Sequence, residues 1–277
     1  MRRHLIILAL LLLVGGTQAA DVTNAANATQ MAGATQDANL TQQTALASTF
    51  KVCPTGCQYT SIQEAVYAAK PNDIIEIGSG TYDGNVFLTK DLTLRGIDTG
   101  SGEPKVTGDL YYNNYKFSVK GFGFESAVDP WPYLDYAEEN SIDYWIALGD
   151  DQSNDKSYAD AVESYNKALK MDPRNPYTLI QKAVALGGSG RFEESLDIIN
   201  ESLKIDPYYD YAWGYMGEIY NKMENYNQAL NAEDQAITLK PSVGYNWYQK
   251  GNALQGLQRD DEAKAAFDKA EELGYTG

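Results

Sequence analysis

The sequence has few of the residues on which most enzyme sites depend. Its 277 residues include one histidine and two cysteines. The histidine, His4, lies in a segment that we expect to be removed, so the mature chain would contain none. This excludes histidine acid–base catalysis, histidine-activated nucleophiles and histidine metal sites. The two cysteines, Cys53 and Cys57 in the run CPTGC, cannot form a metal-ligand set, and in an exported protein they predict a local disulfide.

Positive charge is also scarce. The chain has 22 basic and 38 acidic residues, a formal net charge of −16. Loss of Arg2 and Arg3 with the first segment would leave 20 basic residues against 38 acidic ones, a net charge of −18. A chain this acidic repels phosphate backbones, which excludes nucleic acid as a partner. We predict neither a metal nor a cofactor.

A hydrophobic run long enough to cross a bilayer is absent too. The apolar run Leu5 to Val14 has ten residues, whereas a membrane-spanning helix needs about 20. It follows a basic start and precedes small residues, with Thr17 and Ala19 spaced for cleavage. Residues 1–20 therefore have the pattern of a secretory signal peptide. We expect a secreted or cell-surface protein, anchored in the membrane if the signal is not cleaved.

Residues 21–49 have almost no groups that can form a core. Of these 29 residues, 21 are Thr, Ala, Asn or Gln, and none is aromatic. Such a stretch cannot bury enough apolar surface to offset its ordering entropy, so it predicts a disordered, exposed stalk. Sequons at Asn27 and Asn39 make these two asparagines candidate glycosylation acceptors.

Residues 50–128 change to short β-rich runs. A short amphipathic helix is predicted over Ser61–Ala69, and Ser61 with Glu64 fits a capping box. The runs that follow it are punctuated by glycines; they are Ile74–Ile77, Val86–Leu88, Leu92–Leu94, Val106 and Phe117–Val119. Short strands at regular spacing, with glycine at the corners, predict stacked coils.

The run from Cys53 to Gly100 resembles the N-terminal cap and first coils of a right-handed parallel β-helix of the pectin-lyase-like type. It is particularly similar to the NosD-like repeats of exported microbial proteins. The resemblance ends near Phe124, which implies a truncated β-helix of only two or three coils behind the cap helix. Enzymes of this superfamily place carboxylates on several coils of one long face. So short a face cannot hold a sugar chain and position a base, and we predict no catalysis.

Residues 142–277 repeat with a period of 34. Prolines 173, 207 and 241 share this spacing, as do four columns of large or small residues: Trp145, Leu179, Trp213 and Trp247; Gly149, Ala183, Gly217 and Gly251; Ala161, Ser195, Ala229 and Ala263; Ala168, Ser202, Ala236 and Ala270. The pattern resembles four tandem tetratricopeptide repeats, residues 142–175, 176–209, 210–243 and 244–277, with the third nearest the family pattern.

The resemblance implies an all-α solenoid of four helix–turn–helix units after the β-helix. Small residues let the two helices of a unit approach closely, and proline ends each second helix. Residues 129–141 are predicted to be a linker. Within it, Asp129–Leu134 is expected to plug the open end of the β-helix and to join the two domains semi-rigidly.

The first helices of the repeats are expected to line a concave groove. One column there carries Tyr177, Tyr211 and Tyr245, and tyrosine is frequent at interface hot spots. A second group near it is predicted to complete the site: Asp150, Glu218 and Asn252. The resemblance implies peptide binding, but the carboxylate clamp of some relatives is absent. Because the groove is expected to be acidic, a neutral or basic protein segment is the predicted partner.

The sequence therefore predicts an exported, non-enzymatic scaffold that binds protein or peptide. The alternative is a carbohydrate-binding or carbohydrate-active envelope protein that acts through the β-helix, where residues 111–115 (YYNNY) form an exposed cluster suited to polysaccharide. A third hypothesis is a structural unit that self-associates through its uncapped end. There the last helix, Asp261–Leu273, would expose Ala265, Phe267 or Ala270.

Overall fold

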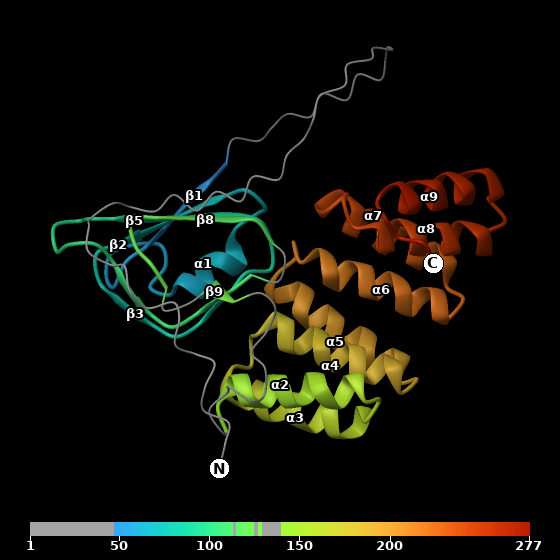
Figure 1. Ribbon diagram of the computed structural model, residues 1–277, viewed down its shortest axis with the longest axis horizontal. Helices are drawn as coiled ribbons and strands as arrows, with labels where there is room; N and C mark the ends of the chain where they lie inside the picture. Colours follow the sequence, from blue (N-terminus) through green and yellow to red (C-terminus); the bar gives the residue numbers. More distant parts are fainter. Residues whose placement is uncertain (1–46, 113–114, 125–126, 129–139) are drawn as a thin grey trace, which may run out of the picture.

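The structure is a computed structural model that describes residues 47–112, 115–124, 127–128 and 140–277. The predicted signal peptide, Asn27, Asn39, the plug and nearly all of the stalk lie outside the described residues. Figure 1 shows two regions side by side: a β-rich region, which we call the β part (residues 47–128), and a stack of helices, which we call the repeat array (residues 140–277). Within the described residues, no helix is long and apolar enough to span a bilayer.

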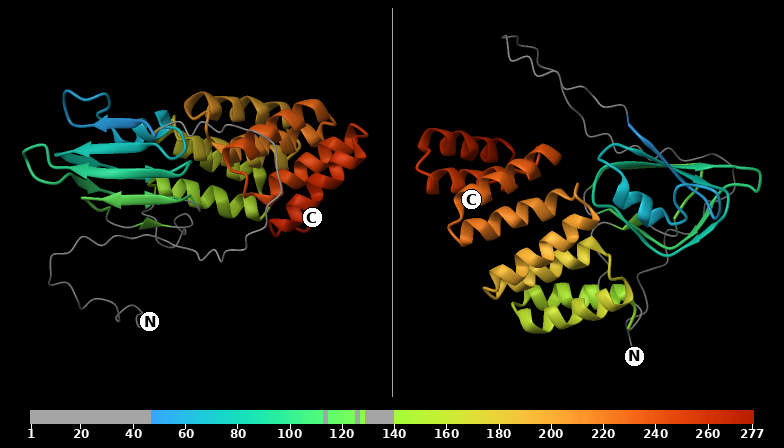
Figure 2. Two further views of the ribbon diagram at one scale, coloured as in Figure 1. Left: turned by 90° about the horizontal axis from the view of Figure 1, so that it is seen from above. Right: turned by 180° about the vertical axis from the view of Figure 1, so that it is seen from behind.

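Short parallel strands build the β part. They are β1 (Thr49–Val52), β2 (Ile74–Gly78), β3 (Thr81–Asp83), β4 (Val86–Phe87), β5 (Leu92–Ile97), β6 (Lys105–Thr107), β7 (Leu110–Tyr111), β8 (Phe117–Lys120) and β9 (Ala127–Val128). Among the described residues they form three sheets, with orders β1-β2-β5-β8, β3-β6 and β4-β7-β9. From β2 to β7 the chain visits the three sheets in the same order twice (Figure 2).

Register places apolar side chains of successive strands in stacks. Ile75 pairs with Leu94, and Leu94 with Val119. Helix α1 (Ile62–Ala68) adds its buried face to this core, and Ser61 caps it by accepting a hydrogen bond from the amide of Glu64. The five predicted runs are strands here. The sequence pattern missed β1, β3, β7 and β9, which have two to four residues each and are too short to show alternation.

Eight helices of the described residues form the repeat array. They are α2 (Ile142–Asn154), α3 (Tyr158–Met171), α4 (Pro176–Gly188), α5 (Phe192–Ile205), α6 (Asp210–Lys222), α7 (Tyr226–Leu239), α8 (Gly244–Gly256) and α9 (Asp260–Glu272). Each of the prolines 173, 207 and 241 lies two residues beyond the end of a second helix. The predicted array of helix pairs is confirmed, and its last helix begins and ends one residue earlier than expected.

Close helix packing explains the small-residue columns. A Cβ atom at Gly149 would clash with the ring of Tyr165, and one at Gly251 with the ring of Phe267. Gly217 has the same place in the third repeat, but there the side chain that covers it is Glu233. Both carboxylate oxygens of Glu233 are buried and have no hydrogen-bond partner, and burial raises its pKa well above the ordinary value.

The β part packs against the edge of the array formed by the turns between repeats. Arg174 in the first turn donates to both carboxylate oxygens of Glu64 at 2.9 Å. At the third turn, the ammonium of Lys240 lies 4.1 Å from the ring centre of Tyr115. The hydroxyl of Tyr115 donates to Asp210 at 2.8 Å. The two regions also share one cluster of buried apolar residues. This contact was not predicted.

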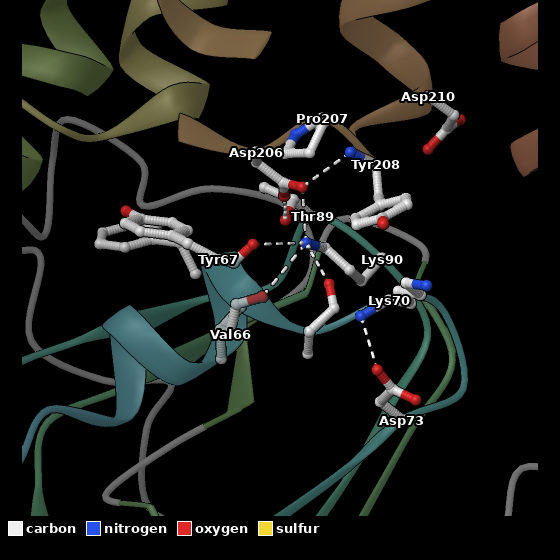
Figure 3. Close-up of polar contacts among 12 residues, drawn as sticks. Val66, Tyr67, Lys70, Asp73, Thr89, Lys90, Asp206, Pro207, Tyr208 and Asp210 are labelled. Carbon is white, nitrogen blue, oxygen red and sulfur yellow. Dashed lines mark hydrogen bonds and ion pairs between the residues drawn. The ribbon is translucent and has the colours of Figure 1, made fainter. Parts of the chain in front are cut away.

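A buried ion pair lies at the centre of this joint (Figure 3). The ammonium of Lys90 lies 2.6 Å from Asp206 of the second turn, and both side chains are almost fully buried. Lys90 also donates to the carbonyls of Val66 at 3.1 Å and Ala69 at 3.0 Å, at the C-terminal end of α1. Asp206 accepts further hydrogen bonds from Thr89 and from the amide of Tyr208. Both ions are thus fully hydrogen-bonded, which buried charges require.

Candidate functional site: the concave groove of the array

A pocket of about 500 Å³ lies on the face formed by the first helices of the repeats. Tyr211, Tyr245 and Glu218, three of the residues expected in a partner-binding groove, line it. A second pocket of about 450 Å³ adjoins it through Glu218 and contains Asn252. Neither lining includes Tyr177 or Asp150. Four of the six predicted residues therefore meet along this surface, which we call the groove.

Tyr177 and Asp150 belong to a buried cluster instead. Tyr177 is only 6% exposed. Asp150 accepts hydrogen bonds from the hydroxyls of Tyr165 at 2.7 Å and Tyr177 at 3.1 Å, and from the amide of Gln181 at 3.2 Å. Burial raises the pKa of Asp150 to about 6, against the opposing effect of these hydrogen bonds. The prediction that Tyr177 faces a partner is therefore wrong, because its hydroxyl pairs with this carboxylate.

The same contact recurs two repeats later in a more accessible form. Tyr245 donates to Glu218 at 2.7 Å, and Lys222 forms an ion pair with the same carboxylate at 2.7 Å. Gln249 donates to the hydroxyl of Tyr245. Because Lys222 neutralises Glu218, and because Lys156 also lines the pocket, the first pocket has one carboxylate and two ammonium groups. The expectation of an acidic groove is therefore corrected.

The middle junction lacks this carboxylate. Val184 has the position of Asp150 and Glu218 in the second repeat, so this position offers no carboxylate to the hydroxyl of Tyr211. Tyr211 is 42% exposed, and Met171 is the other large apolar side chain exposed among the described residues. The ring of Tyr211 packs near that of Tyr209, with ring centres 6.1 Å apart, but its hydroxyl has no hydrogen-bond partner among the described residues and is available to another molecule.

Sequence reasoning missed other lining residues, above all Asn246 and Tyr215. Asn246 follows Tyr245, and its side chain packs over Gly214, where a Cβ would lie 2.7 Å from its oxygen. Tyr215 donates to the carbonyl of Val184 at 3.3 Å. The glycine at 214 was the available signal, because it permits close approach of a neighbouring helix.

The predicted sugar-binding cluster does not have the expected exposure. Tyr111 is buried in β7 and stacks on Phe87, with ring centres 4.9 Å apart. Tyr115 is buried in the joint with the array. Tyr112 is half-buried, and residues 113 and 114 lie outside the described part. Tyr111 and Tyr115 are therefore not available to stack on a sugar.

The structure also bears on the predicted disulfide and on the apolar surface expected at the C-terminal helix. Cys53 and Cys57 form a disulfide with Cα atoms 5.5 Å apart. At the C-terminal end, Ala270 is buried and Ala265 exposed. Tyr248 covers half-buried Phe267, with ring centres 5.5 Å apart. The apolar surface expected to drive self-association is thus largely covered. Among the described residues, no group of three or more acidic, cysteine or histidine side chains is arranged to hold a metal.

Comparisons with known proteins identify tetratricopeptide repeats. The tetratricopeptide repeat family model matches residues 142–175 and 245–273, the first and last repeats. The third repeat, which we expected to be nearest the family pattern, is not matched. Glu233 replaces an aromatic residue there, since Tyr165 and Phe267 hold this place in the two matched repeats.

Several solved structures are similar to about half of this chain. A crystal structure of MamA is 24% identical, with a TM-score of 0.45, and the match covers 50% of this chain and 81% of that one. MamA residues 41 to the end from Desulfovibrio magneticus RS-1 is 19% identical, with a TM-score of 0.45, covering 50% and 77%. A comparison with curated proteins finds no match.

Proposed function

We propose that this chain is a non-enzymatic scaffold that binds a segment of another protein in the groove. The observation that carries the proposal is Tyr211, an exposed aromatic side chain without an internal hydrogen-bond partner, between two junctions whose tyrosines are paired. The tetratricopeptide match supports it. Aromatic residues with a polar tip contribute strongly to protein interfaces.

The partner segment that fits this groove best is uncharged. Glu218 is already paired with Lys222, so a basic side chain would have to compete with that lysine. Tyrosine, asparagine and glutamine side chains supply most of the other polar groups in the two pockets. This narrows the sequence-based expectation of a neutral or basic partner to the neutral one.

The β part is proposed to be a short right-handed β-helix that holds the array rigidly. Parallel register in all three sheets and the repeated order of visits to them support this. Export is proposed from the signal-peptide pattern of residues 1–20. Fractionation of the producing cells tests it, and recovery of the protein in the cytoplasm with its first 20 residues intact would contradict it.

The binding test uses the full chain, immobilised and exposed to an envelope extract of the producing cells. Tyr211→Ala should abolish retention of the partner protein without loss of helical circular dichroism. Met171→Ala is the matched control, because Met171 is also exposed but does not line the groove. Equal retention by parent and Tyr211→Ala would sink the proposal, and retention of a glycan by both would assign the function to the β part.

A further inference from the structure

We propose that the groove contains a recognition site for a peptide group, in which the side-chain amide of Asn246 pairs with an amide of the bound segment. This deepens the proposed function, because it names the chemistry by which that groove binds its partner. The inference depends on one buried polar side chain and on the exposed tyrosine beside it.

Asn246 is a buried polar side chain in the first pocket of the groove, and the described residues supply no hydrogen bond to it. It is 4% exposed and lines the pocket. No described residue hydrogen-bonds to its side-chain amide, although most buried polar side chains in proteins have such a partner. Its close packing on Gly214 holds it in place. A buried amide facing a pocket is a donor and an acceptor ready for a ligand.

The chemistry of an asparagine side chain selects the ligand group. Its carbonyl accepts and its NH₂ donates, so an amide that offers N–H and C=O side by side satisfies both. A carboxylate cannot donate, and an ammonium cannot accept. The main-chain peptide group, or an asparagine or glutamine side chain, is therefore the complementary partner for Asn246.

The neighbours of Asn246 fit an extended polypeptide rather than an ion. Tyr211 on α6 and Tyr245 on α8 line the same pocket, and their rings can flank a segment that crosses it. Of the lining charges, Glu218 and Lys222 neutralise each other at 2.7 Å. Lys156 lies in the turn after α2, whereas Asn246 lies on α8. These are the first and the last of the helices whose residues line the pocket.

A small probe tests this inference without knowledge of the partner. Isotope-labelled full-length protein is titrated with N-acetylglycine N-methylamide, which carries two peptide groups, and with acetate as the charged control. We expect the side-chain NH₂ resonance of Asn246 to shift saturably with the diamide at millimolar concentration. Acetate should leave it unchanged.

Two variants separate recognition from folding. Asn246→Leu should weaken diamide binding at least tenfold while leaving the far-ultraviolet circular dichroism intact. Asn246→Asp, which keeps the shape but loses the donor, serves if the leucine variant unfolds, and it should weaken binding likewise. Equal binding by parent and variants, no response to the diamide, or a Lys156-dependent response to acetate would each overturn the assignment.

The outcomes also distinguish this inference from the proposed function. If a protein is retained in a Tyr211-dependent manner while Asn246 does not respond to the diamide, only the amide site fails. If Asn246 binds the diamide but no protein is retained, the scaffold role fails and the site stands.

Discussion

The two long surfaces of the repeat array differ in how their polar groups are satisfied. On the edge that meets the β part, each turn between repeats has its own partner, and Lys90, Asp206 and Tyr115 are buried and paired. In the groove, Tyr211 is exposed and its hydroxyl is not paired with a carboxylate. Asn246 is buried there, and its side-chain amide has no hydrogen-bond partner among the described residues. The edge is therefore a structural joint, and the groove is the surface with capacity left for another molecule.

The comparison extends to the repeats themselves. Tyr177 and Tyr245 have carboxylate partners at the same spacing, whereas Val184 leaves Tyr211 without one. The tyrosines of one column therefore have two environments. Tyr177 and Tyr245 are hydrogen-bonded to carboxylates at the two outer junctions, and Tyr211 is exposed at the middle one. Substitutions that add or remove partners can test this distinction.

The largest effect is expected at the joint. Lys90→Met leaves Asp206 buried without its cation, and we expect the free energy of unfolding to fall by about 3–5 kcal/mol. Urea unfolding followed by circular dichroism measures it. Arg174→Gln is the control, because its ion pair with Glu64 is solvent-exposed and should contribute under about 1 kcal/mol. An equal loss in both variants would contradict the assignment of the joint to the Lys90–Asp206 pair.

A gain in stability is expected inside the third repeat. Glu233→Phe replaces a buried, unpaired carboxyl by the aromatic type that covers Gly149 and Gly251. The free energy of unfolding should rise by about 1–3 kcal/mol, the cost of an unsatisfied buried group. Thermal unfolding measures the change. Glu233→Gln, which keeps a polar group there, should gain less; a lower melting temperature for Glu233→Phe would show that Glu233 has an unseen structural role.

The Asp150 cluster should make stability depend on pH. Its folded pKa of about 6 lies above the ordinary 3.8, so the folded state holds the proton more tightly between these values. The contribution of Asp150 to stability is therefore greatest below about pH 4 and is lost as the pH rises to about 6, by up to about 3 kcal/mol. Urea unfolding at pH 4 and pH 7 measures the fall. Asp150→Asn should reduce it by that amount; an unchanged fall would exclude Asp150 as a contributor.

The smallest effect on stability is expected at the middle junction. Val184→Glu gives Tyr211 a carboxylate at the place where Asp150 and Glu218 serve the other tyrosines. The change in unfolding free energy should stay within about 1 kcal/mol, because a new hydrogen bond offsets lost apolar contact. Partner binding should weaken several-fold, measured on the retained protein. Undiminished binding would show that a free Tyr211 hydroxyl is not required.

Local pattern predicted most of the array and less of the β part. The 34-residue period placed the helix pairs to within about one residue, because small residues and prolines report helix contacts and ends that lie within one repeat. Strands such as β3 and β7 were not predicted, since their two or three residues gain stability only from strands elsewhere in the chain.

In the candidate site, residue type was easier to predict than environment. The 34-residue period, together with the groove that the tetratricopeptide resemblance implies, predicted Tyr211, Tyr245, Glu218 and Asn252, and these four line the two pockets. The predicted exposure of Tyr177 was wrong because the column of tyrosines does not reveal that Asp150, 27 residues earlier, accepts a hydrogen bond from its hydroxyl. The predicted exposure of Tyr115 was wrong for the same reason, because its hydrogen-bond partner, Asp210, lies 95 residues later in the chain.

The sequence by itself determined the helical repeats, the glycine-cornered strands, the spacing of Cys53 and Cys57, and the scarcity of histidine, of which the chain has one. These depend on composition and on contacts between residues close in the chain. Only the tertiary structure decided which charges pair across the joint and which tyrosine remains exposed. Burial of Lys90 with Asp206 joins residues 116 positions apart, and such a contact depends on how two separately patterned regions pack.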